Sequence, residues 1–303
     1  MIPIFLLDAK ENWVCDRFVK EWYQENSDIS THDIDQAKTI WLLAGWCWNQ
    51  ISPQMLESKN VILTIHHIVP DKFDDQRLRE FMIRDRFVNV YHVPCKKTKD
   101  QISSLTKKPI FVIPFWANQN LWFDIKDKKG IREKYGLPVD SFIVGSFQRD
   151  TEGSDLKSPK LEKGPDLFCD YVIDLSKRTE NLKVLLAGWR RQYVMNRLNF
   201  AEIPFYYCEL PGFDVINDLY NCLDLYVVSA RHEGGPQSII ECALTRTPII
   251  STDVGLASEF LSEESIFDES WNASPNIDAA HNNIKKIMIP SGFKKFKDMI
   301  FSL

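Results

Sequence analysis

Short apolar runs alternate with amphipathic helical patterns twice along this chain, and this alternation constrains the fold more than any other feature. The runs are unbroken, as in strands buried on both faces, and strands that alternate with helices form parallel sheets. The sequence therefore predicts an α/β protein with two parallel-sheet domains. Strands are expected at 2–8, 39–46, 60–67, 87–94 and 108–116, then at 141–148, 181–189, 203–210, 223–230, 247–253 and 264–268. Helices are expected at 13–24, 75–87, 164–178, 213–221, 235–246 and 256–263.

A polar, basic and turn-rich stretch at 122–141 separates the two sets of strands. A length of 303 residues agrees with two domains of about 150 residues each. We therefore expect a first domain over 1–125, a linker over 126–139, a second domain over 140–285 and a C-terminal helix over 286–303.

Charge and composition exclude several classes of protein. The net charge of −5, from 37 basic and 42 acidic residues, gives no polycation to hold nucleic acid. No apolar run approaches the roughly 18 residues of a membrane-spanning helix, and the first residues lack the basic start of a secretory signal. The 7 cysteines form no CxxC pair, which favours buried free thiols in a reducing compartment. We expect a cytoplasmic protein, with the inner membrane surface as the alternative location.

The segment around Glu233 and Glu241 carries the clearest chemical signal. Gly234, Gly235 and Pro236 lie between the end of an expected strand and the start of an expected helix. Free backbone N–H groups and the helix dipole at such a loop suit an anionic phosphate, and glycines allow close approach. Two carboxylates beside the same ligand can hold sugar or ribose hydroxyls. The alternative is an ordinary strand–loop–helix turn with a glutamate on the helix surface.

Six segments of the second half occur in a recognisable order over roughly 140–265: VGSFQRD, EKGPDLF, LLAGWRR, LYNCLDLYVVSARHEGGPQSIIECA, TPIIS and DVGLASE. In this order they resemble glycosyltransferase family 4, the retaining, nucleotide-sugar-dependent enzymes of GT-B fold. The resemblance implies two Rossmann-like domains that face each other across a donor-binding cleft. It also implies transfer of a sugar from a UDP- or GDP-sugar to a glycan or lipid-linked saccharide acceptor, as in polysaccharide biosynthesis.

The same resemblance assigns roles to individual residues. Arg149 and Lys163 would bind the donor diphosphate and stabilise the departing nucleotide, with Lys160 as a competitor of Arg149. Because two cations and helix amides would neutralise the diphosphate, no metal or other cofactor is expected. The further assignments are Glu233 to the donor sugar, Glu241 to the ribose, the amides of Gly234 and Gly235 to the sugar and phosphate, and the loop from Leu210 to Phe213 to the base.

The first half matches the family weakly. His66, after the expected strand at 60–67, aligns with a histidine that faces the donor sugar, although a histidine after a strand is often structural. Asp33 and Asp35 spell the metal motif of a different glycosyltransferase fold, but their polar surroundings favour a solvated loop. The first strand lacks the Gly-Gly loop usual in the family. In the second half Arg246 and Leu256 stand where glycine is common.

Two rival functions remain at this point. One is a non-catalytic subunit that binds a nucleotide sugar, which the short first domain favours, and the other is a nucleotide-sugar epimerase. The paired-glutamate loop favours transfer over epimerisation. A dinucleotide oxidoreductase is disfavoured, because no GxGxxG follows a first strand.

The C-terminal residues predict an amphipathic helix. Phe293, Phe296 and Ile300 share one helical face, and three lysines lie elsewhere. In the family a final helix crosses back to the first domain. The alternative is a helix that lies on a membrane surface and contacts a lipid-linked acceptor. Asp298 offsets part of the lysine charge, so we favour packing.

Overall fold

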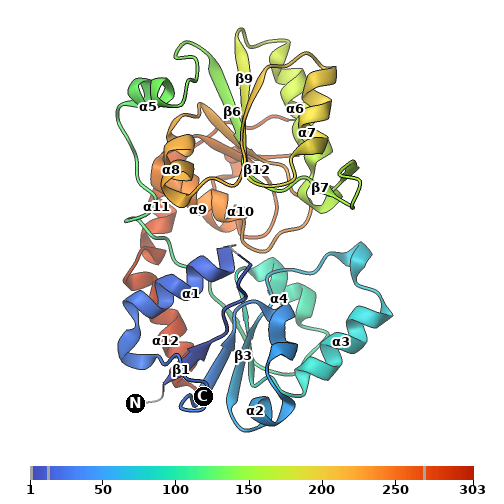
Figure 1. Ribbon diagram of the computed structural model, residues 1–303, viewed down its shortest axis with the longest axis vertical. Coiled ribbons are helices and arrows are strands. Elements are labelled where there is room, and N and C mark those ends of the chain that lie inside the picture. The colour runs from blue at the N-terminus through green and yellow to red at the C-terminus, as the bar shows by residue number, and fades with distance from the viewer. Residues whose placement is uncertain (1–2, 12–13, 269–270) are drawn as a thin grey trace. The chain divides into compact units, whose positions relative to one another are not determined.

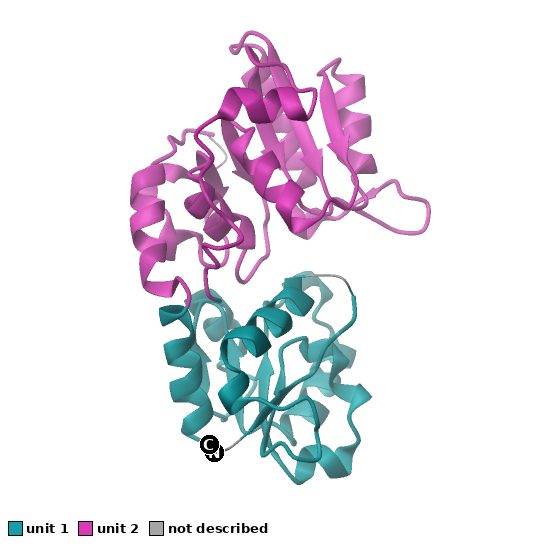
Figure 2. Cartoon of the chain, turned by 60° about the vertical axis from the view of Figure 1, so that its left-hand side comes forward, with its two compact units in different colours: residues 1–115, 290–303 teal, residues 116–289 magenta. Residues whose placement is uncertain are grey.

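The computed structural model describes residues 3–11, 14–268 and 271–303. Trp13, the first residue of the expected helix 13–24, lies outside this part of the chain. The chain forms two compact units, the first from Met1–Phe115 with Pro290–Leu303 and the second from Trp116–Ile289 (Figure 2).

Unit 1 is built on a five-stranded parallel sheet in the order β1-β2-β3-β4-β5. Ser30 also forms a parallel bridge with Ile4. Ser30 and β2 therefore pair with opposite edges of β1. The strands are β1 (Ile4–Leu6), β2 (Thr39–Leu42), β3 (Asn60–Thr64), β4 (Val90–Val93) and β5 (Ile110–Val112). The helices are α1 (Val14–Glu25), α2 (Pro53–Glu57), α3 (Asp75–Asp85), α4 (Lys96–Ile102) and, from the C-terminal residues, α12 (Lys294–Phe301).

Alternate residues of these strands build two separate layers of core, because successive side chains of a strand point to opposite faces. Ile40, Leu63 and Tyr91 belong to the cluster that packs under α2, α3 and α4 (Figure 1). Their strand neighbours Trp41 and His92 point to the opposite face, where α1 and α12 lie.

The C-terminal helix α12 is part of unit 1. Phe296 is fully buried, and its ring lies 5.3 Å from that of Trp41 and 5.0 Å from that of His92. Phe293 meets Trp22 edge-on at 5.6 Å, whereas Lys294 and Lys295 are exposed. The apolar face of this helix is therefore used in packing and is not presented to a membrane surface.

Unit 2 contains a six-stranded parallel sheet in the order β10-β9-β6-β11-β12-β13. The two central strands, β6 and β11, pair directly although the chain enters them far apart, so the strand order reverses between them. The strands are β6 (Phe142–Ser146), β9 (Leu182–Ala187), β10 (Phe205–Cys208), β11 (Leu225–Val228), β12 (Ile249–Thr252) and β13 (Ile266–Phe267), and a hairpin of β7 (Thr151–Glu152) and β8 (Ser158–Pro159) follows β6.

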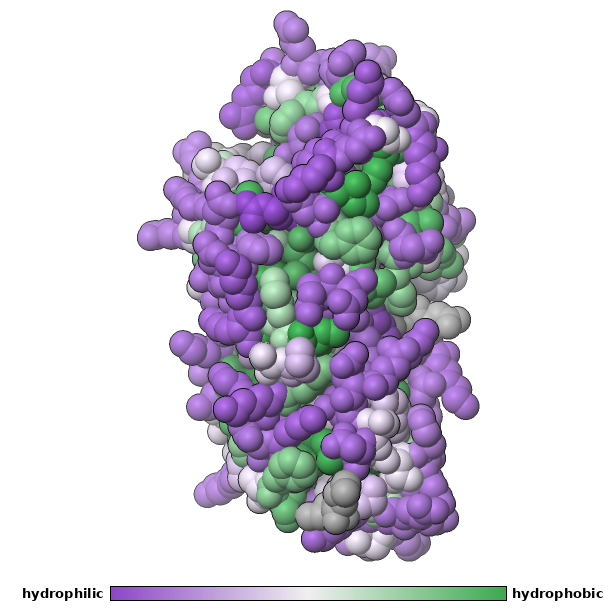
Figure 3. Space-filling model, turned by 90° about the vertical axis from the view of Figure 1, so that its left-hand side faces the viewer, coloured by the Kyte–Doolittle hydropathy of each residue, from purple (hydrophilic) through white to green (hydrophobic). Residues whose placement is uncertain are grey.

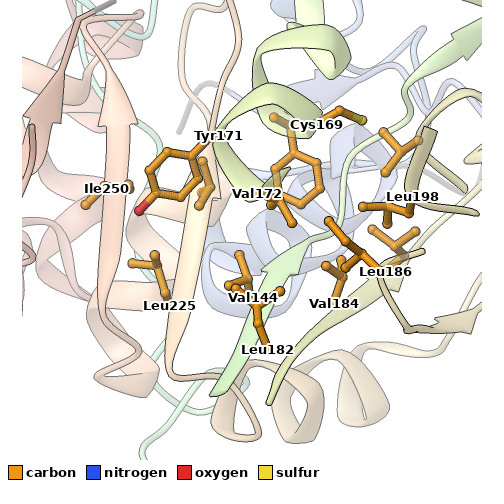
Figure 4. Packing of buried hydrophobic residues seen from close by; sticks show 14 of the residues in the cluster. Val144, Cys169, Tyr171, Val172, Leu182, Val184, Leu186, Leu198, Leu225 and Ile250 are labelled. Carbon is orange, nitrogen blue, oxygen red and sulfur yellow. The ribbon is translucent and has the colours of Figure 1, made fainter. Parts of the chain in front are cut away.

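Helices cover both faces of this sheet, with α6 and α7 on one side and α8, α9 and α11 on the other (Figure 1). Under α6, buried Val144 and Val184 of the strands meet Val172 of the helix (Figure 4). The helices are α5 (Lys128–Lys134), α6 (Pro165–Ser176), α7 (Gln192–Phe200), α8 (Phe213–Asn221), α9 (Gln237–Thr245), α10 (Ala257–Phe260) and α11 (Ile277–Ile284). Two parallel α/β sheets are the architecture that the sequence predicts.

The division between the units falls earlier in the chain than the expected end of the first domain at residue 125. Trp122 packs edge-on against Tyr220 of α8 at 5.9 Å, and the backbone N–H of Ile125 donates to Asn221 at 2.8 Å. The expected linker over 126–139 contains α5, in which the buried Arg132 binds Asp224 at 2.7 Å. Residues 116–139 therefore belong to unit 2, because their side chains complete its core.

Most of the surface in Figure 3 is hydrophilic, with hydrophobic residues in small groups between polar ones. Within the described residues, none of the helices has the length and apolar character needed to cross a membrane.

Candidate active site

The loops that leave β6 and β11 lie at the carboxyl edge of the unit 2 sheet, where the strand order reverses. Ligands of open α/β sheets bind at such a point, because the loops of the two neighbouring strands diverge there. The loop after β6 leads through the β7–β8 hairpin to Lys163, and the loop after β11 carries Glu233. The fold therefore brings residues 70 positions apart to one place.

Lys163 and Glu233 form an ion pair through Nζ and Oε1. Their side chains are 18% and 17% exposed, so both are half-buried and still open to a ligand. The carbonyl oxygen of Lys163 accepts a hydrogen bond from the Gln148 side chain at 2.8 Å. The lysine and the glutamate are thus held side by side.

Gly164 explains why a Lys-Gly pair precedes α6. Its φ is +60°, and a Cβ atom there would lie 1.8 Å from the carbonyl oxygen of Ser229. Only glycine allows the start of α6 to touch the end of β11 this closely. The backbone N–H groups of Arg231 and His232 also donate to the carbonyl oxygen of Glu162, at 2.9 and 3.0 Å. The lysine loop and the glutamate loop therefore form one bonded assembly.

Gly255 fixes a third loop against the Glu233 loop. With φ at +54°, a Cβ atom would lie 2.3 Å from the carbonyl oxygen of Gly234. The sequence DVG after β12 thus packs directly on the residues that were assigned to the sugar and phosphate.

Positive charge gathers beside Lys163. Burial lowers the pKa of Lys160, and the charges of Lys163 and Arg149 lower it further, although Glu162 partly offsets this at 3.4 Å. Arg149 donates through Nε to the carbonyl oxygen of Thr151 at 3.0 Å. Glu233 and Glu162 pair with Lys163 and Lys160, so the cluster of three cations and two carboxylates keeps a net positive charge that favours an anion such as a diphosphate.

Glu241 lies in α9, where it is 9% exposed. Its Oε2 accepts a hydrogen bond from the hydroxyl of Tyr220 at 2.8 Å. Burial and the neighbouring carboxylate raise the pKa of Tyr220 well above its ordinary value, so the phenol stays protonated and donates. Tyr220 thus holds Glu241 in place, a role that its position in a buried apolar segment did not indicate.

Leu210 and Phe213 follow β10 at the same edge of the sheet. They are 61% and 42% exposed, which is unusual for large apolar side chains and suits a flat ring such as a base. Phe213 also meets Trp122 edge-on at 6.1 Å.

A buried ion pair that we did not anticipate supports the Arg149 loop. Arg191 is fully buried, binds Asp150 at 2.6 Å, and donates to the carbonyl oxygen of Ala187 at 2.7 Å. It ties the end of β9 to the residue that follows Arg149. Trp189 lies 5.3 Å from the guanidinium of Arg149 and is 40% exposed. Trp189 and Arg191 belong to the segment LLAGWRR. The two arginines after the expected strand were the sequence feature that could have indicated this ion pair.

Arg246, where the family commonly has glycine, adopts φ +56° at the end of α9 and pairs with Asp278 of α11. The ion pair accompanies a backbone conformation that glycine adopts more readily. This departure therefore affects a helix end and leaves the Glu233 loop intact.

His66 lies in unit 1, two residues after β3. Its Nε2–H donates to the carbonyl oxygen of Leu43 at 3.0 Å, and its ring stacks on Phe115 at 5.7 Å. It also lines a cavity of about 330 Å³ within that unit.

The Asp33 and Asp35 motif forms an exposed turn, in which the Asp35 N–H donates to Asp33 at 2.9 Å. No cluster of metal-ligating side chains occurs among the described residues.

Comparisons with known proteins agree with this fold. The structure of Anabaena HepE in complex with UDP-glucose covers all of both chains with a TM-score of 0.77 at 13% identity. Sucrose-phosphate synthase from Thermosynechococcus elongatus matches 94% of this chain and 71% of its own, with a TM-score of 0.60 at 15% identity. The chain thus has the α/β fold of GT-B glycosyltransferases, with two parallel sheets.

Residues 155–287, which include Lys163, Glu233 and Glu241, match the model of the family described as Glycosyl transferases group 1. The lipopolysaccharide core biosynthesis mannosyltransferase LpsB of Rhizobium meliloti is 28% identical over 142 residues. That match covers 45% of this chain and 38% of the relative, so the likeness in sequence is confined to part of each protein.

Proposed function

We propose that the chain is a retaining glycosyltransferase that moves a sugar from a nucleotide diphosphate donor to a glycan or lipid-linked saccharide acceptor. The observation that carries the proposal is the Lys163–Glu233 pair at the point where the strand order reverses, inside the glycosyl transferases group 1 domain. The UDP-glucose bound to HepE and the mannosyl transfer named for LpsB support a nucleotide-sugar donor.

In this proposal Lys163, Arg149 and the backbone amides around Gly234 and Gly235 hold the diphosphate. As the bond between the sugar and the diphosphate breaks, negative charge grows on the leaving oxygen, and fixed cations stabilise it. The retained diphosphate then accepts the proton of the acceptor hydroxyl on the same face of the sugar. Glu233 contacts the sugar, Glu241 holds the ribose through the carboxylate that Tyr220 orients, and Leu210 and Phe213 contact the base.

His66 is assigned to the sugar as a neutral imidazole. Its Nε2–H already donates to Leu43, which fixes the ring and the position of that proton. In this role the ring holds a hydroxyl or stabilises developing charge, and it is not the residue that attacks the sugar.

The first experiment is turnover of a panel of UDP- and GDP-sugars with saccharide acceptors, in the presence and absence of EDTA. Activity that EDTA leaves unchanged is expected, because the cations of the protein replace a metal ion at the diphosphate. Activity that EDTA abolishes and Mg²⁺ or Mn²⁺ restores contradicts the metal-independent mechanism. Tight donor binding without any turnover favours the binding-subunit alternative.

The second experiment is NMR of the product formed from an α-linked donor. Retention gives an α-linked product, whereas a β-linked product overturns the mechanism. Glu233→Gln is expected to reduce turnover more than donor affinity, the signature of a contact made in the transition state. An equal loss of both would instead indicate a ground-state contact.

A further inference from the structure

The cavity in unit 1 that His66 lines has a charged and aromatic wall that the proposed donor chemistry does not use. It opens at the carboxyl ends of β2 and β3, where Gly45, Trp46 and His66 follow the strands, and α3 closes it with Phe81 and Arg84. Gly45 permits this arrangement, because a Cβ atom there would lie 2.7 Å from the carbonyl oxygen of Thr64. A volume of about 330 Å³ is in the range of small-molecule pockets.

Arg84 contributes a half-buried positive charge to the cavity. Its Nη1 donates to the carbonyl oxygen of Gly45 at 3.3 Å, and its Nε is buried without an acceptor. Within the described part of the chain, no carboxylate forms an ion pair with it. Burial lowers its pKa, although the guanidinium stays charged. The Glu80 carboxylate acts on Arg84 electrostatically but forms no ion pair with it, so an oxyanion that reached the open side of the guanidinium would bind favourably.

The other charged residues of the wall do not cancel this charge. Arg77 and Glu80 pair with each other at 2.9 Å, and among the described lining residues the two arginines face Glu80 as the carboxylate. The balance of the charged lining is therefore positive, although the whole chain carries a net charge of −5.

Trp46 supplies a flat apolar surface at the same cavity. It is 49% exposed, and its Nε1–H donates to Glu11 at 3.0 Å, which holds the ring in place. The His66 ring lies 5.7 Å from it. An exposed, fixed indole is a suitable platform for the C–H face of a sugar ring.

We propose that this cavity binds a saccharide that carries an oxyanion, either a phosphate or a carboxylate. The guanidinium of Arg84 would bind the oxyanion through Nη2 on its open side, because Nε is buried and Nη1 donates to Gly45. Trp46 would pack on the sugar ring. In this proposal the saccharide is the acceptor of the transfer, and that role rests on the proposed function. Binding of the saccharide at the cavity does not depend on the proposed function.

The test observes the ligand at the cavity itself. The indole N–H of Trp46, assigned with Trp46→Phe, is followed by NMR in protein labelled with ¹⁵N-tryptophan. The probes are glucose 1-phosphate, glucuronate, glucose and inorganic phosphate, and the tighter of the two charged sugars identifies the oxyanion. At least one charged sugar is expected to shift this resonance at a concentration at least tenfold lower than glucose or inorganic phosphate requires. No shift, or equal binding of glucose, overturns the proposal.

Arg84→Gln is expected to weaken the charged sugar at least tenfold, because the positive charge and the Nη donors are lost. Arg79→Gln is the matched control, since Arg79 is an exposed arginine of the same helix that does not line the cavity, and it should change affinity less than twofold. If Arg84→Gln does not fold, Arg84→Lys keeps the charge but loses the planar group that Gly45 holds through Nη1, and it should also weaken binding. Unchanged affinity in the folded Arg84 variant overturns the proposal.

Saturating UDP separates this site from the donor site. The Trp46 response to the charged sugar should persist when UDP is bound, and its loss would show that the sugar occupies the donor site instead. Failure of any nucleotide sugar to bind, with the Trp46 response intact, overturns the proposed function and leaves the anion site standing.

Discussion

At the scale of single residues, His92 is a titratable group that the fold of unit 1 buries completely. Its Nε2–H donates to the carbonyl oxygen of Ile113 at 2.7 Å, and its Nδ1 accepts from the hydroxyl of Thr64 at 3.0 Å. The same hydroxyl accepts from the indole N–H of Trp41 at 2.9 Å. This network uses both ring nitrogens of the neutral form, and burial lowers the pKa of His92 to about 3.

We predict that His92 makes the free energy of unfolding depend on pH between about 6.5 and 3. Above this window the histidine is neutral in both states, and the stability is fully present. As the pH falls, the unfolded chain binds a proton that the native chain does not, so stability decreases by up to about 1.4 kcal/mol per pH unit. Urea unfolding at pH 7.5 and 5.0 should show a loss of about 2 kcal/mol that His92→Gln removes. An equal pH dependence in both proteins contradicts this assignment.

We also predict that Gly164→Ala is far more damaging than a matched change at Gly136. Both glycines have positive φ, +60° and +64°, so alanine costs about 1–2 kcal/mol at either position. At Gly136 no atom lies within 4 Å of the new Cβ, whereas at Gly164 the Ser229 carbonyl oxygen lies 1.8 Å away. Gly164→Ala should therefore cost several kcal/mol more, measured by denaturant unfolding. Equal costs would mean that the two loops are not in contact.

At the scale of elements, α12 joins unit 1 through one aromatic face. Phe296 contacts Trp41, His92 and Phe115, whereas Phe301 at the end of the same helix is 54% exposed. We predict that Phe296→Ala lowers the free energy of unfolding by about 3–5 kcal/mol and that Phe301→Ala lowers it by less than about 1 kcal/mol. Chemical denaturation of both variants checks this. Similar losses would show that the helix is not docked through this face.

The strands were predictable from sequence because both sheets are parallel and buried on both faces. Each expected apolar run contains an observed strand, including the short β13. Helices α2, α4, α5, α7 and α11 were not predicted, because their segments are short or mostly polar and lack a clear apolar stripe. The helical face of Phe293, Phe296 and Ile300 was predictable because its period is regular.

The assembly of the candidate site was only partly predictable. The Lys-Gly and Glu-Gly-Gly segments indicated the candidate residues of the site from sequence. Only the fold shows that Gly164 touches Ser229 and that Gly255 touches Gly234. Tyr220 and Arg191 were missed as supporting residues because each acts through a partner distant in sequence, 21 and 41 positions away. Arg84 was missed because an arginine in an amphipathic helix gives no sign that its Nε is buried.

At the scale of the whole molecule, the two units differ in the chemistry that their described residues offer. Unit 2 gathers Arg149, Lys160 and Lys163 beside a carboxylate and suits a diphosphate linked to a sugar. Unit 1 places Arg84 and Trp46 around its cavity and suits an anionic saccharide. In the proposed function the nucleotide diphosphate binds to unit 2 and the acceptor binds to the cavity of unit 1.

Calorimetric titration of the donor into wild-type and Lys163→Ala protein tests the central claim most directly. We predict that one UDP- or GDP-sugar binds the wild type and that Lys163→Ala weakens it by about 1.5–3 kcal/mol, because a charge-assisted hydrogen bond to the diphosphate is lost. Lys177→Ala, which removes an exposed lysine directly after α6, should leave the affinity unchanged. Unchanged affinity in Lys163→Ala would contradict the donor site at the carboxyl edge of the unit 2 sheet.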